Sequence, residues 1–174
     1  MPRSLKTEAI VLRKRSLLGK DVLVSLFTES EGKVNVIAKG VKKITSRRSP
    51  HLETGNLISV QLHKKKDRNY LEGSNLLSGF SELKKDQNKV NILYQFFFVL
   101  ERLLPEHQKE DVVYNLTKSF LIKLSKSVSN YDILPLYLNR LLNKLGYTKK
   151  DHDLIELEAI ISDLINEKIP TIAI

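Results

Sequence analysis

The hydrophobic residues of this 174-residue chain follow two different periods, one in each half. Up to about residue 80 they alternate with polar residues in short segments separated by turns, which is typical of a small antiparallel sheet. Beyond residue 80 they recur every three or four positions, which is typical of amphipathic helices. We therefore expect a β domain at residues 1–80, followed by a helical domain at residues 81–174.

Five segments of the first half are predicted to be strands: a short apolar run at 9–12, alternating segments at 21–28, 34–39 and 58–63, and a weaker segment at 70–76. So few short strands bury little as a flat sheet, whereas closure into a barrel removes the exposed edges. The Glu-Ser-Glu-Gly stretch at 29–32 predicts a hairpin in which Gly32 takes a positive φ. The fold class is thus predicted as α+β, an N-terminal five-stranded OB-fold β-barrel followed by a C-terminal all-helical bundle. An SH3-like barrel fits the pattern almost as well.

Four helices are predicted in the second half, at 87–104, about 110–128, 134–145 and from 153 onward. Gly146 is placed to end the third helix in a left-handed conformation. Asp153, with Glu156 three residues later, resembles a capping box that opens the fourth helix. Pro170 marks the expected end of that helix.

The chain lacks the residue patterns of known catalytic sites. It has no cysteine, which excludes disulfides, cysteine-bound zinc, iron–sulfur clusters and thiol catalysis. Its four histidines are isolated, and neither a glycine-rich phosphate loop nor a nucleophile elbow occurs. We therefore predict that the protein is not an enzyme and holds no cofactor and no metal.

Apolar runs in the sequence are short. An apolar run of only four residues precedes the arginine at position 13, which is too short for a signal peptide. The most apolar later run, 96–100, is far below the roughly 20 residues of a membrane-spanning helix. The sequence thus favours a soluble, cytoplasmic protein.

The excess of positive charge is confined to the first half of the chain. Residues 1–80 hold 16 Lys+Arg and 7 Asp+Glu, whereas residues 81–174 hold 13 of each. An excess of this kind in one domain indicates a polyanionic partner, nucleic acid above all.

Basic residues of the first half form three groups, each at the end of an expected strand or in the loop after it. Since strand ends meet at the rims of a barrel, these groups are expected to converge on a groove that follows a phosphate backbone. Of the aromatic residues at 27, 70 and 80, only Tyr70 is a candidate for base stacking, so binding is expected to depend on charge. The predicted DNA-binding residues are Arg13, Lys14, Arg15, Lys33, Lys39, Lys42, Lys43, Arg47, Arg48, Lys64, Lys65, Lys66, Arg68 and Tyr70.

Several runs, in order and spacing, resemble the bacterial RecO family of recombination mediators; they are Thr7–Arg13, Leu26–Thr28, Gly32–Lys33, Ala38–Lys43 and Leu145–Tyr147. The resemblance implies an OB fold with a helical domain, binding to single- and double-stranded DNA, and annealing of complementary strands. It also implies help in loading recombinase onto DNA coated by single-strand-binding protein. The implied partners are RecR and the acidic, apolar-ended tail of single-strand-binding protein.

Two stretches depart from the family pattern. Leu17-Leu18-Gly19 stands where the family usually has an aromatic residue, glycine and glutamate. Many relatives carry a four-cysteine zinc module after the Leu-Gly-Tyr element, whereas here residues 148–153 lead directly into the last helix.

Two other functions stay open. The chain could be a generic OB-fold protein that binds RNA or DNA without a mediator role. Alternatively, it could be a protein–protein adaptor in which the helical bundle matters and the basic barrel only aids solubility. A pocket for the tail of single-strand-binding protein needs a cation beside an apolar cleft, and Arg102 and Arg140 are the candidates.

Overall fold

The computed structural model describes residues 4–43, 45–129 and 132–170. Its contacts divide the chain into two compact units, which we call the barrel unit and the helical unit. The barrel unit comprises Met1–Gly79 and Pro105–Glu110, and the helical unit comprises Phe80–Leu104 and Asp111–Ile174. The segment 105–110, which connects two helices along the chain, thus belongs by its contacts to the barrel unit.

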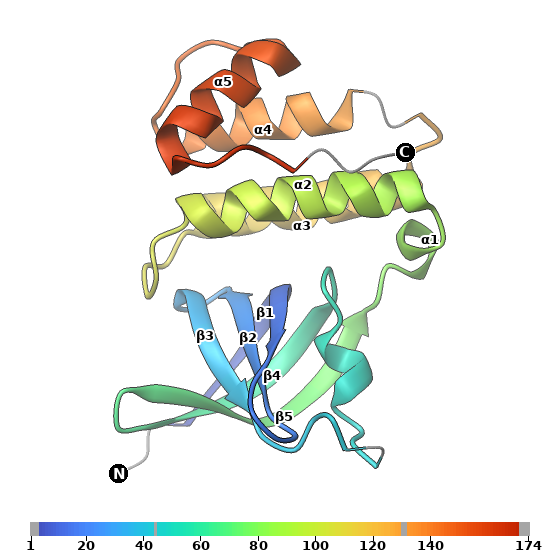
Figure 1. Cartoon of the computed structure of the whole chain (residues 1–174), viewed down its shortest axis with the longest axis vertical. Coiled ribbons are helices and arrows are strands. Elements are labelled where there is room, and N and C mark those ends of the chain that lie inside the picture. Colours follow the sequence, from blue (N-terminus) through green and yellow to red (C-terminus); the bar gives the residue numbers. More distant parts are fainter. Residues whose placement is uncertain (1–3, 44, 130–131, 171–174) are drawn as a thin grey trace. The chain divides into compact units, whose positions relative to one another are not determined.

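The strands of the barrel unit close into a five-stranded barrel in the order β1-β2-β3-β5-β4 (Figure 1). Neighbouring strands are antiparallel except β3 and β5, which run parallel and pair only at Val36–Asn69 and Ile37–Tyr70. The prediction of an OB-fold barrel followed by helices is confirmed. The strands are β1 (Ser4–Ser16), β2 (Val22–Thr28), β3 (Gly32–Ala38), β4 (Leu57–Lys65) and β5 (Arg68–Ser78).

The barrel core follows from the alternation seen in the sequence. On β2 and β3, every second residue from Val22 and from Val34 points inward, and these side chains are buried. Leu52, from a 3₁₀ helix at Ser49–Leu52, joins the same core together with Val41. The remaining members of the core are Ala9, Val11, Ile58, Val60, Leu62 and Leu71.

Gly32 begins β3 and takes the positive φ expected of it, +73°. A second constraint applies at this glycine, because a Cβ there would lie 1.8 Å from the backbone oxygen of Gln108. Segment 105–110 runs beside β3 at this point, with a parallel bridge between Lys33 and Glu106 and a hydrogen bond of 2.9 Å from His107 N to Lys33 O. Only glycine allows this close approach.

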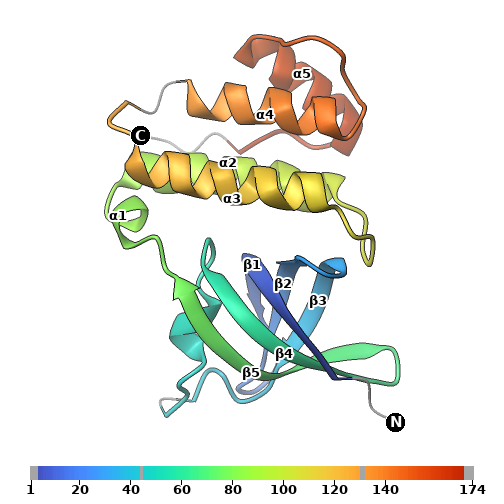
Figure 2. The same cartoon turned by 180° about the vertical axis from the view of Figure 1, so that it is seen from behind.

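The helical unit contains a short α1 (Ser81–Lys84) and four longer helices, of which α2 and α3 lie side by side in both views (Figures 1 and 2). Its core combines many buried leucines with a cluster of aromatic rings. The rings of Phe96 and Phe120 stack at a centroid distance of 4.1 Å, and Tyr137 meets Phe120 edge-on at 5.3 Å. No helix in the described part of the chain is both long and apolar enough to cross a membrane. The longer helices are α2 (Gln87–Leu103), α3 (Asp111–Lys126), α4 (Ile133–Lys144) and α5 (Leu154–Ile165).

Gly146 ends α4 as predicted, with φ +84°. Its N–H donates to the carbonyl of Asn143 at 3.2 Å, and the N–H of Tyr147 donates to that of Leu142 at 2.9 Å. This pair of bonds is a Schellman motif, which satisfies carbonyl groups that a helix end otherwise leaves free.

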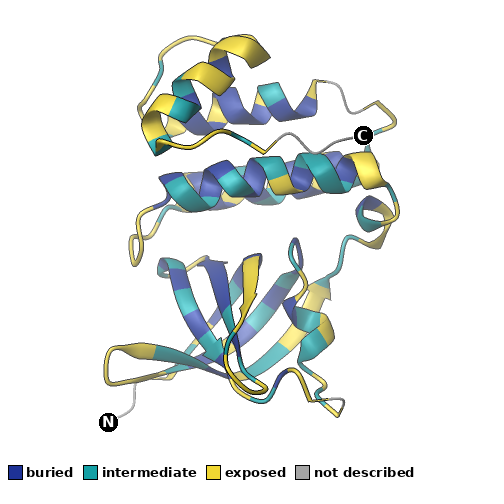
Figure 3. Cartoon of the chain, viewed as in Figure 1, coloured by how far each residue is buried: buried dark blue, intermediate teal, exposed yellow. Residues whose placement is uncertain are grey.

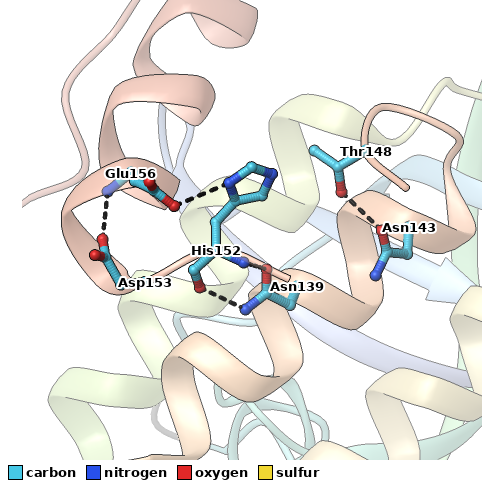
Figure 4. A network of polar contacts seen from close by, with 6 residues as sticks. All are labelled: Asn139, Asn143, Thr148, His152, Asp153 and Glu156. Atoms are coloured by element: carbon cyan, nitrogen blue, oxygen red, sulfur yellow. Dashed lines mark hydrogen bonds and ion pairs between the residues drawn. The ribbon is translucent and has the colours of Figure 1, made fainter. Parts of the chain in front are cut away.

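The connection from α4 to α5 is held by a polar network (Figure 4). The buried side chain of Asn139 donates to His152 O at 2.8 Å and accepts from His152 N at 2.9 Å. The carboxylate of Asp153 accepts from Glu156 N at 2.9 Å, which confirms it as the N-cap of α5. Glu156 does not complete a capping box, because its carboxylate lies 3.0 Å from the ring of His152.

The end of α5 differs from the prediction. The helix stops at Ile165, and Asn166 follows with φ +55°. Asparagine tolerates this left-handed conformation because its short polar side chain bonds locally. The helix therefore ends five residues before Pro170.

Candidate nucleic-acid interface

A row of outward side chains crosses the barrel near the ends of its strands. The strand registers place Arg15 opposite Leu23, Leu23 opposite Ile37, Ile37 opposite Tyr70 and Tyr70 opposite His63. Directly opposed residues point to the same face of a sheet, and their neighbours along β2, β3 and β5 point into the core. We call these five residues the outer row. Arg15 is exposed and the other four are half-buried. Along β3, buried positions alternate with half-buried ones (Figure 3).

This row lies on the part of an OB barrel that generally binds oligonucleotides, the face of strands 2 and 3 between the β1–β2 and β4–β5 connections. Both connections carry predicted basic residues. Arg13 and Arg15 lie on β1 just before the first connection, and Arg13 pairs with Ser25 one step along the same face. The expected end of the first strand at Leu12 was too early, because β1 continues to Ser16.

The β4–β5 hairpin gathers the third basic group on a two-residue turn. Lys65 pairs with Arg68 across the hairpin, and Lys64 pairs with Asn69. Lys66 forms the turn with φ +52°. All four cations of this hairpin are exposed, so their charge is open to a ligand.

Tyr70 is already occupied by two neighbours. Its ring stacks on that of His63 at 5.3 Å and 18°, and Lys39 Nζ lies 5.0 Å from its centroid. His63 in turn lies 3.2 Å from a carboxylate oxygen of Glu72. Tyr70 therefore holds Lys39 in place, and a nucleotide base would have to compete with both neighbours to stack on it.

Two basic residues, Lys42 and Arg48, anchor the loop that follows β3. Arg48 donates to the carbonyls of Leu71 at 3.1 Å and Lys39 at 2.7 Å. Lys42 donates through its side chain to Leu17 O at 2.9 Å. These side chains tie the loop to β5 and to the β1–β2 connection. Lys39, Lys43 and Arg47 are exposed.

Two predicted residues lie apart from this arrangement. Lys14 is paired with Glu53 at 3.1 Å. Lys33 lies on β3, six residues before Lys39, and six residues span about 20 Å in an extended chain. Beside it, Glu106 accepts a hydrogen bond of 2.6 Å from Asn35 Nδ2. A carboxylate thus lies on this half of the β3 face.

The two arginines predicted for partner binding have different surroundings. Arg102 forms two bonds of 2.9 Å with the carboxylate of Glu167, and its guanidinium lies 3.4 Å from the Phe98 ring centroid. It therefore joins α2 to the segment after α5. Arg140 is exposed, with its guanidinium 5.1 Å from the ring centroid of Tyr137.

The surface of the helical unit has a hollow of about 500 Å³ between α3 and α4, which we call the α3–α4 groove. Tyr137, the residue that Arg140 contacts, is part of its lining. Sequence reasoning missed this groove, because its lysines count toward a half with no net charge. The only signal was the cluster of three lysines on one helix. The lining residues are Asn115, Lys118, Ser119, Ile122, Lys123, Lys126 and Tyr137.

Within the described residues, no group of three or more histidine, cysteine, aspartate or glutamate side chains is placed to hold a metal ion. The basic groups described above are suited to binding anions.

Residues 1–80 match the protein family described as "Recombination protein O N terminal". Curated relatives named DNA repair protein RecO match a larger part of the chain. Those of Syntrophobacter fumaroxidans and Caldanaerobacter subterraneus subsp. tengcongensis are 28% and 30% identical over 83% of this chain, covering 58% and 59% of their own lengths. The relative of a Roseiflexus strain is 24% identical over 97% of this chain and 59% of its own length. The chain thus spans less than two thirds of the relatives it matches.

Proposed function

Because the chain belongs to the RecO family, we propose that it is a non-enzymatic DNA-binding protein of recombinational repair. In this proposal the outer row and the basic groups beside it bind single- and double-stranded DNA. The protein then anneals complementary strands and helps to load recombinase onto DNA coated by single-strand-binding protein.

The observation that carries the proposal is the position of the basic groups on both connections that flank the outer row. Each Lys or Arg that neutralises a phosphate of a single strand releases counterions, and the logarithm of affinity then falls by about 0.7 per contact for each tenfold rise in salt. Five to eight contacts would give a slope between about −3.5 and −5.6. Steep loss of affinity with salt is therefore the expected signature.

Aromatic stacking contributes little in this proposal. Phe27 is fully buried, and Tyr70 is engaged by His63 and Lys39. Binding through phosphates leaves the base edges available, which suits a protein that pairs two strands.

The test is fluorescence anisotropy with single-stranded DNA over a salt series. A variant with Arg15→Gln, Lys39→Gln, Lys64→Gln and Arg68→Gln removes four charges around the outer row. Four lost contacts should reduce the slope by about 2.8 and weaken binding by about 10²- to 10³-fold at 0.1 M salt.

The matched control removes four exposed lysines of the helical unit, at positions 144, 149, 150 and 168. It has the same net charge and should keep the wild-type slope. Equal losses in both variants would show that overall charge, and not this surface, governs binding.

The mediator role is tested by annealing of complementary strands that are first coated with single-strand-binding protein. Stimulation by this protein supports the proposal. Without stimulation, only the generic nucleic-acid-binding function would stand. Calorimetry with RecR checks the remaining family partner.

The α3–α4 groove supports the proposed binding of the tail of single-strand-binding protein. Positive charge comes from Lys118, Lys123 and Lys126. An apolar side chain comes from Ile122, which is 44% exposed. Arg140 contacts Tyr137 beside them, whereas Arg102 is taken up by Glu167. We therefore prefer Arg140 to Arg102 for this role.

Titration with a tail peptide tests this site. Arg140→Ala and Lys123→Ala should each weaken peptide binding, while Lys150→Ala serves as an exposed control. Unchanged affinity in both groove variants would remove the groove as the tail site.

A further inference from the structure

The β1–β2 connection carries an apolar residue at its tip. Leu18 is 97% exposed, between Leu17 and Gly19, and Gly19 turns the chain with φ +72°. Single exposed apolar residues are common on protein surfaces. What sets Leu18 apart is how its neighbours are held and what surrounds it.

The residues on both sides of Leu18 are fixed by hydrogen bonds. Leu17 N donates to Asp21 O at 3.0 Å, which closes the connection on itself. Lys42 donates from its side chain to Leu17 O at 2.9 Å and from its backbone N–H to Lys20 O at 2.9 Å. The tip is thus preorganised, and a preorganised group loses little conformational freedom when it contacts a ligand.

A fourth bond strengthens this support from the same loop. Gly40 N donates to Asp21 Oδ1 at 2.8 Å, so the carboxylate is used within the protein. The loop that carries Lys39, Lys42 and Lys43 therefore holds the tip as well.

Cations flank the tip along the chain. Arg15 leads into it and belongs to the outer row, and Lys20 follows it and is exposed. DNA offers the complementary chemistry, with phosphates for the cations and unstacked bases for an apolar side chain. Proteins that bind DNA frequently insert leucine, isoleucine, methionine or phenylalanine as a wedge at base steps.

We propose that Leu18 is an apolar wedge that packs against an unstacked base of a DNA strand held along the outer row. This inference rests on the proposed DNA binding and assigns it a contact with the bases. It requires no particular base, because every base offers an apolar face. Contact at one step would disturb stacking without reading sequence.

The test uses single-stranded DNA with 2-aminopurine at several positions, because the fluorescence of this base rises when it unstacks. The wild-type protein should raise the signal. Leu18→Ala should lose most of this rise and bind about three- to tenfold more weakly, as expected when most of one apolar contact is lost. Leu18→Phe should retain both properties.

Salt dependence separates this contact from the phosphate contacts. An apolar contact releases no counterions, so Leu18→Ala should keep the wild-type salt slope while the whole line shifts to weaker binding. Ile155→Ala is the matched control, because Ile155 has an isomeric side chain that is 80% exposed on α5. This variant should change neither the DNA affinity nor the 2-aminopurine fluorescence.

The outcomes are distinct. If the wild-type protein binds no DNA, the proposed function fails and the wedge fails with it. If the wild-type protein binds but Leu18→Ala has the same affinity and the same 2-aminopurine signal, only the wedge is overturned. A reduced salt slope in Leu18→Ala would also overturn it, since the variant would then have disturbed the phosphate contacts.

Discussion

The barrel unit and the helical unit use their basic side chains in different ways. Around the outer row, residues such as Arg15, Lys39 and Lys64 are exposed. In the helical unit, Arg102 binds Glu167 through two hydrogen bonds, and the buried Lys89 donates to Ser125 O at 3.2 Å. The charge of these three barrel residues is thus open to a ligand, while Arg102 and Lys89 stabilise the fold of the helical unit.

The hydrophobic cores of the two units differ in the side chains that fill them. The helical unit packs aromatic rings against one another, whereas the barrel is filled mainly by small branched side chains. Large rings contribute stability through their buried area. The comparison predicts that core substitutions in the helical unit mainly change stability, and that surface substitutions on the barrel mainly change binding.

The largest effect is expected from Phe120→Ala. This fully buried ring stacks on Phe96 and meets Tyr137, so its loss should lower the free energy of unfolding by about 3–5 kcal/mol. Chemical denaturation followed by circular dichroism measures it. Ile122→Ala, on the same helix but 44% exposed, should cost far less, and equal costs would contradict the aromatic core.

The second largest effect is expected from Gly32→Ala, which should lower the free energy of unfolding by about 2–4 kcal/mol. The substitution combines a positive φ with a clash between the new Cβ and Gln108 O. The control is Gly19→Ala. Gly19 has almost the same φ, +72°, but nothing within 4 Å of a Cβ, so only the backbone strain remains, about 1 kcal/mol. Thermal unfolding of the two variants isolates the contact of segment 105–110 with β3; equal shifts in Tm would show that this contact contributes nothing.

Asn139→Ala should lower the free energy of unfolding by about 1–3 kcal/mol, since it leaves the backbone N–H and carbonyl of His152 without their partners. Hydrogen exchange at the amide of His152 should rise with it. Asn143→Ala removes a more exposed amide that bonds Thr148 and serves as the control (Figure 4). Exchange at His152 that is unchanged in Asn139→Ala would rule out the network as the support of this connection.

The smallest effect is expected from Glu106→Gln. Removing this carboxylate from the β3 face, where it accepts a hydrogen bond from Asn35, should tighten single-stranded DNA binding by about two- to threefold. Anisotropy at low salt measures it, with Glu158→Gln on α5 as the control of equal charge. A gain in both variants would extend the binding surface beyond the barrel and weaken the contrast between the two units.

Sequence patterns predicted the fold well where the periodicity was continuous. Alternation along β2 and β3 located both strands and the turn at Gly32. The end of β1 was misplaced because Arg13, Lys14 and Arg15 end the apolar run, although a strand at a barrel rim can carry such residues toward solvent. The four-residue helix α1 was not expected, since it is too short to show a helical period.

The interface could be predicted only in part. Strand ends indicated where basic groups would gather, but which residue meets which depends on register and on long-range contacts. The contact of Lys39 with Tyr70 depends on the parallel pairing of β3 with β5. Arg48 binding to Leu71 O and segment 105–110 lying on β3 join residues far apart in the sequence, and no local pattern encodes them.

The pairing of β3 with β5 has a consequence of its own. Closure of the ring depends there on two residue pairs, and one of them, Ile37 with Tyr70, lies in the outer row. A nucleic-acid strand bound along that row would contact both β3 and β5 and would stabilise their pairing. Occupancy and ring closure are therefore thermodynamically linked, and the amides at this pairing should be the ones whose exchange slows most when the surface is filled.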